Sequence, residues 1–307
     1  GRYVQTNGYN QIINRRQFGG VSPRHGLALS YDEMPFLPPD TLRLTTTYGE
    51  SLEVSVGGLD LHLHHDRGET DDHTWVWVPA HRALCVGDLV TWVFPNAGNP
   101  QKVQRYPLEW ARALRRMMDF DAELLLPAHG LPIRGADRIR IVLTHLAEAL
   151  ESLVEQTVTL MNEGATLDEI VHTVGLPDAW LERPWMRPVY DEPTFVVRNI
   201  WRLYGGWWDL DPSQLKPAPK SAVAAEIVAL AGGTRALVDR AAELADRGEL
   251  VMACHLIELA AHAEPDSVSV HGVRREIYAA RRASESSLMS KGIFSAAARE
   301  SAAITDG

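Results

Sequence analysis

The chain changes character at Gly135, and this change constrains its fold more than any other feature. Before Gly135, short alternating or β-branched apolar runs are separated by turn residues, which is typical of strands. After it, residues 136–164 follow one long amphipathic pattern of helical period that is closed by Gly164. This order predicts a mixed α/β part followed by an all-α part.

The length of 307 residues predicts two domains, because one ordinary core rarely grows so large. We expect residues 1–135 to form the α/β domain with an N-terminal arm, and residues 136–307 to form the helical domain. Residues 1–40 show no period and are predicted to be a long loop or arm. In the rest of the first domain, strands are predicted at 42–48, 51–58, 59–65, 74–79 and 82–88, a helix at 107–118, and an apolar run from 122 to the turn with His129.

The helical part carries its own local signals. Thr166 and Glu169 have the spacing of a capping box, which predicts a helix that begins there. Residues 213–220 are predicted to be a linker. The short helix pairs beyond it, broken by Gly and Pro, are typical of tetratricopeptide-like packing, with too little self-similarity for a repeat array. The predicted helices are 221–231, 234–247, 250–263, 267–282 and 286–302.

Composition narrows the function classes. A net charge of −10 without an evident basic patch argues against a nucleic-acid binder. The sequence contains no run of 18 apolar residues, so no membrane-spanning helix is predicted. Cys85 and Cys254 stand far apart, which excludes a disulfide framework and disfavours a zinc site built from cysteines. The sequence opens without Met or a signal pattern, so we expect its start to be a cut or a processing site. A cytoplasmic location is expected, with the periplasm and secretion left open.

The stretch "LHLHHDRGETDDH" at 61–73 contains four histidines. In a strand, Leu61 and Leu63 would share one face, and His62 and His64 would share the other. The histidine face is predicted to meet solvent or a sheet edge. His62, His64 and His65 are therefore interpreted as surface or partner-facing residues rather than as metal ligands.

Three other residues have the types and positions that a hydrolytic metal site requires. Zinc in such sites binds His, Asp or Glu and keeps one position open for water, whose pKa the metal lowers toward neutrality. Glu69, Asp88 and His129 each follow a predicted strand and lie in a turn. Each alone could be an ordinary turn residue, but jointly we predict that they are ligands.

These positions resemble the metal-binding turns of the metallo-β-lactamase-fold hydrolases. "GETDDH" at 68–73 stands where that fold has "TPGHTxxH", "VGD" at 86–88 looks like the strand end with the bridging carboxylate, and "PAHG" at 127–130 looks like the loop with the last histidine. A Glu at position 69 is similar to the alkyl sulfatases of this fold. The stretches 159–177 and 197–219 also resemble the dimerisation domain of alkyl sulfatases.

The resemblance implies a fold and a partner arrangement. The chain would be the C-terminal half of a metallo-β-lactamase αββα sandwich followed by an α-helical, tetratricopeptide-like dimerisation domain that forms a homodimer. The main metal motif of the fold, H-x-H-x-D-H, is missing, and "HLHHD" at 62–66 has the wrong spacing. We therefore expect a separate chain to carry the N-terminal half with that motif. The alternatives are a nicked or trimmed longer protein and a degenerate, metal-free relative.

The resemblance also implies a reaction. Two Zn²⁺ ions per complete site, with Fe or Mn possible, would activate water to hydrolyse a sulfate ester as a small anionic substrate. Glu69 would bind one metal, Asp88 would bridge both, and His129 would bind the second. His73 would hold a ligand in place, although a purely structural histidine is an equal alternative. Other readings are hydrolysis of a phosphoester or lactone, metal- and oxygen-dependent chemistry, and a non-catalytic scaffold subunit.

Substrate contacts are predicted at three further positions. Thr91 and Asn96 could donate hydrogen bonds to a sulfate-like oxyanion, and Arg105 could pair with it. The alternative for Thr91 and Asn96 is loop capping. For Arg105 a solvated helix start is the favoured alternative.

Overall fold

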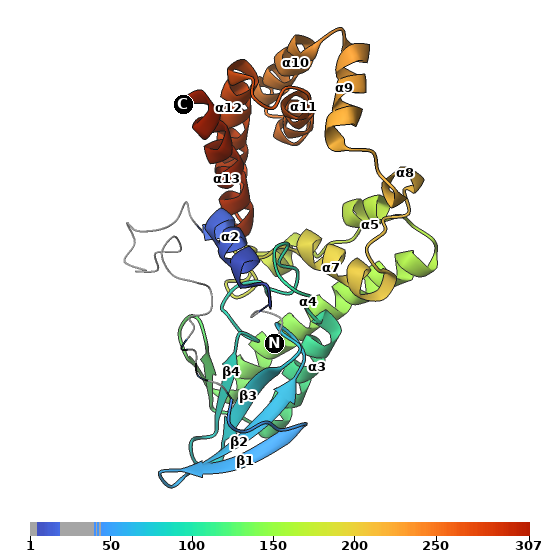
Figure 1. Ribbon diagram of the computed structural model, residues 1–307. Coiled ribbons are helices and arrows are strands. Elements are labelled where there is room, and N and C mark those ends of the chain that lie inside the picture. The colour runs from blue at the N-terminus through green and yellow to red at the C-terminus, as the bar shows by residue number, and fades with distance from the viewer. Residues whose placement is uncertain (1–4, 19–39, 41, 43) are drawn as a thin grey trace. The chain divides into compact units, whose positions relative to one another are not determined.

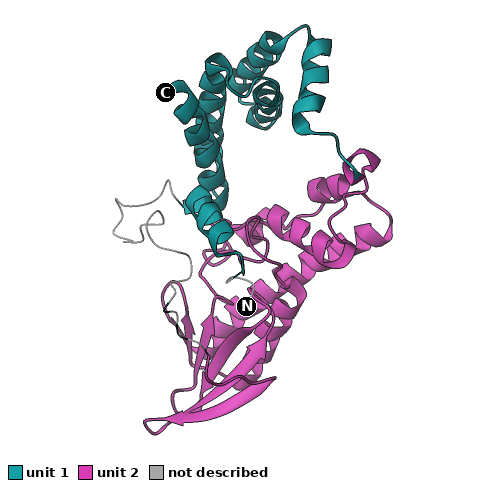
Figure 2. Cartoon of the chain, viewed as in Figure 1, with its two compact units in different colours: residues 1–42, 216–307 teal, residues 43–215 magenta. Residues whose placement is uncertain are grey.

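The computed structural model describes residues 5–18, 40, 42 and 44–307 (Figure 1). Contacts divide the chain into two compact units, shown in Figure 2. Unit 1 comprises residues 1–42 and 216–307, and unit 2 comprises residues 43–215. The predicted class, α/β followed by all-α, is confirmed: unit 2 contains a mixed sheet, and the C-terminal region is helical.

Unit 2 is built on a six-stranded sheet in which the strands follow one another in chain order. All neighbours are antiparallel except β4 and β5, which are parallel. A parallel pair needs a crossover connection, and the helix α3 (Pro107–Met117) lies in it. The strands are β1 (Ser51–Val56), β2 (Leu59–Asp66), β3 (His73–Val78), β4 (Ala83–Gly87), β5 (Leu124–Pro127) and β6 (Ile133–Arg134).

One face of this sheet is covered by α3 and by the long helix α4 (Ala136–Asn162) (Figure 1). Trp75 and Leu84 from the sheet, Trp110 from α3 and Leu143 from α4 are all buried in one apolar cluster. The predicted capping box is confirmed, because Thr166 and Glu169 bond reciprocally at the start of α5. The remaining helices of unit 2 are the 3₁₀ helices η2 (Pro79–His81) and η3 (Met118–Phe120), and the α-helices α5 (Leu167–Thr173), α6 (Asp178–Leu181), α7 (Pro193–Gly205) and α8 (Pro212–Leu215).

The face of β2 that carries the histidines is covered by helices, which is the opposite of the prediction. The ring of His64 stacks on Trp75 with centroids 4.2 Å apart, and burial lowers the pKa of His64. His62 lies opposite the partly buried Trp77 of the same cluster. The histidine face is therefore the helix-covered face, and its predicted exposure to solvent or an edge is wrong.

The leucines of β2 lie on the other face of the sheet, which is also apolar. The strand register places these leucines beside apolar residues of the neighbouring strands. We call this set the outer sheet face, and each of its members is only half-buried: Leu52, Val54, Leu61, Leu63, Val76, Cys85 and Leu126.

Unit 1 is a set of helices with its own core. The helix α2 (Asn7–Phe18) packs against α13, where Gly292 has no room for a Cβ because the carbonyl oxygen of Gln17 lies there. Arg16 of α2 also pairs with Glu300 at 2.6 Å. The loop predicted for residues 1–40 is thus wrong over α2, and residues 19–39 lie outside the described part. The C-terminal helices match their predictions: α9 (Lys220–Ala231), α10 (Thr234–Asp246), α11 (Leu250–Ala263), α12 (Val268–Ser284) and α13 (Leu288–Thr305).

Two further predictions concern the strand at 42–48 and the domain boundary at residue 135. The strand predicted at 42–48 is wrong for the described residues of that range, which form no strand. The predicted boundary at residue 135 does mark the last strand, but the compact units divide at residue 215 because α4 packs on the sheet through α3. The boundary between the catalytic and dimerisation domains stays a prediction.

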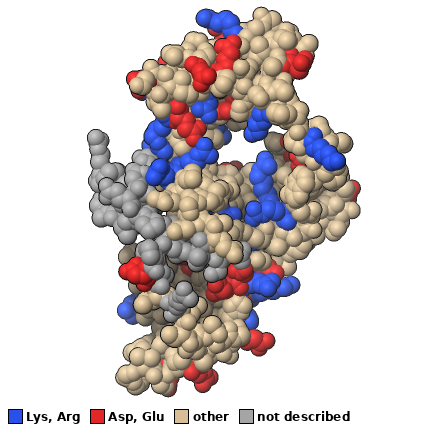
Figure 3. All heavy atoms as spheres, viewed as in Figure 1, with Lys and Arg blue, Asp and Glu red and all other residues tan. Residues whose placement is uncertain are grey.

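The surface of the described residues carries charges of both signs. On the face in Figure 3, basic and acidic side chains are interspersed. No single described helix has the length and hydropathy of a membrane span, although α9 and α10, bent by 88° at the break between them, meet both criteria as a pair.

Candidate functional site

Asp88 and His129, predicted to be metal ligands, lie side by side. They follow β4 and β5, and because these strands are parallel, their carboxyl ends meet at one edge of the sheet. Oδ1 of Asp88 lies 3.4 Å from Nε2 of His129. The Asp88 side chain is 35% exposed and that of His129 is 73% exposed. The pair is therefore close together and open to a ligand.

Backbone and side-chain bonds tie the two loops together. The Ala128 N–H donates to the Gly87 carbonyl at 3.0 Å, and the Trp92 indole donates to the Leu131 carbonyl. Gly130 has φ +97°, and a Cβ there would lie 2.1 Å from the Trp92 ring. The position thus requires glycine for both conformation and space, and this fixes the loop of His129 against the loop of Asp88.

The backbone just before Asp88 is irregular. The β4–β5 register shifts between Cys85 and Gly87, and Gly87 has φ +55°. Bulges of this kind redirect side chains at the end of a strand. His73 supports the bulge, because its Nε2 lies 3.2 Å from the Val86 carbonyl oxygen. His73 therefore contacts the backbone that carries Asp88, and its role toward a metal ligand stays a prediction.

Glu69 and Arg105 form a buried ion pair. Glu69 lies in the turn between β2 and β3, and its carboxylate and its own carbonyl both accept from the Arg105 guanidinium. The two side chains are 16% and 3% exposed. A solvated Arg105 was the favoured alternative, and this burial shows that it is wrong. Arg105 contacts a predicted ligand, and its predicted contact with a substrate is untested.

Thr91 and Asn96 lie in the loop after Asp88, and both are half-buried. The Asn96 Oδ1 atom is buried and finds no hydrogen-bond partner among the described residues. Their predicted contacts with an oxyanion stay predictions.

Tyr190, Asp191 and Asn199 belong to this neighbourhood, and sequence reasoning missed them. Burial, then Asp191, then the carboxylates of Glu69 and Asp88 raise the pKa of Tyr190 to about 12, with Arg105 opposing. The Asn199 side chain donates to the Arg105 carbonyl at 3.0 Å. Tyr190 and Asp191 just before α7, and Asn199 within it, thus stand near the predicted ligands, and no local sequence signal marks them.

Asp191 anchors this arrangement from a fully buried position. Its carboxylate accepts from the Gly98 N–H at 2.7 Å and from the Glu192 N–H at 2.7 Å. Burial raises the pKa of Asp191 to about 7, against the opposing effects of these two N–H groups and of Arg105; Glu192 adds slightly to the rise. Asp191 therefore joins the loop after Asp88 to the start of α7.

The raised pKa predicts a pH dependence of stability. The folded state binds the Asp191 proton more tightly than the unfolded state, so stability from this group is greatest at acid pH and falls as pH rises toward 7. We expect the free energy of unfolding of the wild type, relative to Asp191→Asn, to fall by about 2 kcal/mol between about pH 5 and about pH 7. Urea unfolding followed by tryptophan fluorescence measures this difference, and parallel pH profiles for the two proteins would contradict it.

The donor set is suitable for part of a metal site. Asp88 and His129 offer a carboxylate and an imidazole that are close together and accessible, as a Zn²⁺, Fe or Mn ion requires. Glu69 is engaged by Arg105, and the described residues contain no group of three His, Cys, Asp or Glu side chains placed to hold a metal. The chain therefore shows two adjacent candidate ligands, Asp88 and His129, while Glu69 shares with Asp88 an electrostatic effect on Tyr190.

Comparison with known proteins identifies the helical part. The family "Alkyl sulfatase dimerisation" matches residues 166–303. This part of the chain is therefore similar to an alkyl sulfatase dimerisation domain. A linear primary-alkylsulfatase of Pseudomonas sp. (strain ATCC 19151) is 29% identical over 225 residues, covering 72% of this chain and 43% of the relative. The alkyl/aryl-sulfatase BDS1 of Saccharomyces cerevisiae is 27% identical over 266 residues, covering 84% of this chain and 40% of the relative.

The fold agrees with these relatives. The solved structure of the stereoselective inverting sec-alkylsulfatase Pisa1 from Pseudomonas sp. matches with a TM-score of 0.77 at 20% identity, covering 83% of this chain and 41% of that one. The predicted order, an α/β part followed by helices, is thus confirmed as the fold of the matching part of that sulfatase. The chain spans about two fifths of the length of these relatives.

Proposed function

We propose that this alkylsulfatase relative is part of a binuclear-metal hydrolase that cleaves sulfate esters. The observation that carries the proposal is the contact between Asp88 and His129 at the carboxyl edge of β4 and β5. These two residues would hold metal, Asp88 as the bridging ligand, and Glu69 would turn from Arg105 to complete the ligand set. Zn²⁺ bound there would supply a water of lowered pKa as the nucleophile.

The chain's own residues would then prepare the site for an anionic ester. Arg105 places positive charge beside Glu69 within the protein, where an ion pair is weakly screened. His73 supports the bulge before Asp88, and Trp92 fixes the loop of His129. Thr91 and Asn96 lie in the loop after Asp88 and would donate hydrogen bonds to the sulfate oxygens.

The outer sheet face supports the proposal that more polypeptide completes the site. A sheet with one solvated face normally alternates apolar and polar residues, whereas a sheet covered on both sides is apolar on both. The outer sheet face is apolar across β1 to β5 yet half-buried. A second layer that covers it and contributes the H-x-H-x-D-H ligands would be either a separate chain or another part of a longer protein.

The dimerisation domain supports a homodimer, in which two such sites would be held together. Long helices that bury apolar faces against a second copy would form the interface.

The decisive experiment isolates the protein from its native source and analyses it intact. We expect mass analysis to find additional polypeptide carrying H-x-H-x-D-H, and metal analysis to find about two metal ions per site. Hydrolysis is then compared on sulfate esters, phosphate esters and lactones. Less than one metal per site would leave only the scaffold role, and turnover of phosphate esters or lactones alone would refute the sulfatase assignment.

A further inference from the structure

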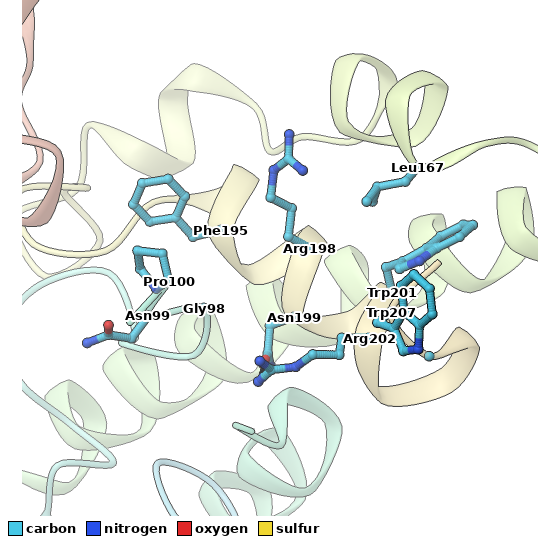
Figure 4. Close-up of a pocket in the computed structure, with 11 residues that line it drawn as sticks. Gly98, Asn99, Pro100, Leu167, Phe195, Arg198, Asn199, Trp201, Arg202 and Trp207 are labelled. Carbon is cyan, nitrogen blue, oxygen red and sulfur yellow. Dashed lines mark hydrogen bonds between the residues drawn. The ribbon is translucent and has the colours of Figure 1, made fainter. Parts of the chain in front are cut away.

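A cavity of about 260 Å³ lies beside α7. Its walls come from the loop at 98–100, from one side of α7 and from the turn that follows it (Figure 4). Glu69, Asp88 and His129 are not among its lining residues.

Two guanidinium groups give the cavity its charge. Arg198 and Arg202 stand four residues apart on α7, where like charges destabilise a helix, and both are exposed. Arg202 donates to the neutral side-chain oxygens of Gln104 at 2.9 Å and Asn199 at 3.4 Å. Within the described ranges neither arginine forms an ion pair with a carboxylate. In a chain of net charge −10, this is an unneutralised positive site.

The rest of the lining is apolar and aromatic. Trp207 is 71% exposed, and Phe195 and Leu167 are half-buried at the cavity wall. Figure 4 shows the Phe195 ring to one side of the two arginines and the indoles of Trp201 and Trp207 to the other. Small-molecule sites combine an apolar lining with a few placed polar groups in this way.

We propose that this cavity binds a small organic anion. The sulfate or carboxylate head would accept charge-assisted hydrogen bonds from Arg198 and Arg202, and the alkyl or aryl body would lie against Trp207, Phe195 and Leu167. The proposal goes beyond the hydrolytic function and does not rest on it, because no predicted metal ligand takes part.

The test is direct binding to the complete protein as isolated from its native source, after its metal has been removed. Hexyl sulfate, hexanoate, hexanol and inorganic sulfate are titrated, with calorimetry and tryptophan fluorescence as readouts. We expect hexyl sulfate or hexanoate to bind at least about tenfold more tightly than hexanol or inorganic sulfate. The preferred anion identifies the head group. Equal affinity for hexanol would show an apolar cleft only, and no measurable binding of either organic anion would overturn the proposal.

Substitutions locate the binding. Arg198→Gln removes a charge that bonds to no described residue, so the fold should persist, and we expect about a tenfold loss of affinity for the preferred anion. Arg138→Gln, at an exposed arginine on α4 outside the cavity, is the matched control and should bind as the wild type does. An equal loss in both variants would mean non-specific attraction and would overturn the site. Binding should also persist in Asp88→Asn, which separates this outcome from a failure of the hydrolytic proposal.

Discussion

Asp88→Asn is expected to lower sulfate-ester hydrolysis by the completed enzyme more than about 100-fold. Loss of an outer partner of a metal ligand already costs about 10–100-fold in metal affinity or activity, and Asp88 is proposed to contact both metals directly. The substitution keeps the side-chain volume but removes the negative charge beside His129. Metal content should fall together with the rate, because a neutral amide is a poor ligand for a hard cation.

The matched control for this prediction is Asp72→Asn. Asp72 is an exposed acid in the turn that carries Glu69, so its loss alters the local charge by the same amount without removing a proposed ligand. We expect its metal content and rate to stay within about twofold of the wild type, as is usual for a surface change. The role of Asp88 would be rejected by an Asp88→Asn enzyme that retained both its metal and its rate.

The elements that sequence predicted well are those with a strong period or a local signal. The strands β1 to β4, the long helix α4 and the capping box at Thr166 each follow from residues close together in the chain. The helix α2 was missed because its own sequence is polar and aperiodic. Its helical state is stabilised by packing on α13, where Gly292 lets the backbone of Gln17 approach closely.

For β2, the sequence separated the two faces but could not predict which of them is buried. Alternation alone distinguished Leu61 and Leu63 from His62 and His64, but it could not say which side the helices would cover. Trp75 and Phe120 supply aromatic surface for His64 and thereby place a histidine at the core. The leucines Leu61 and Leu63 lie instead on the outer sheet face, which is only half-buried.

In the candidate site, too, only some of the residues could be predicted from the sequence. Asp88 and His129 were predicted together because each ends a strand, and the parallel β4–β5 pair brings them to one edge. Tyr190 and Asp191 could not be predicted, because they are about 100 residues further along the chain than Asp88 and approach it only in the folded protein. Tertiary bonds such as that between Asp191 and Gly98 reveal this connection.

Gly98→Ala is expected to destabilise unit 2 by about 3 kcal/mol or more. A Cβ at this position would lie 2.2 Å from the backbone carbon of Phe195 and 2.2 Å from the backbone nitrogen of Val196. Overpacking typically costs about 1–3 kcal/mol when side chains can adjust, and here the obstacle is helix backbone. Moving the loop away would also weaken the bond from the Gly98 N–H to the Asp191 carboxylate, and hydrogen bonds to charged groups contribute about 1.5–3 kcal/mol.

Urea unfolding measures this change cleanly, because all nine tryptophans lie between residues 43 and 215 and their fluorescence therefore reports unit 2 alone. The matched control is Gly175→Ala, at a glycine of the same unit where a Cβ would meet nothing within 4 Å. We expect Gly175→Ala to unfold within about 1 kcal/mol of the wild type, while Gly98→Ala unfolds at a markedly lower urea concentration. Equal midpoints for the two variants would show that the loop after Asp88 does not depend on its close approach to α7.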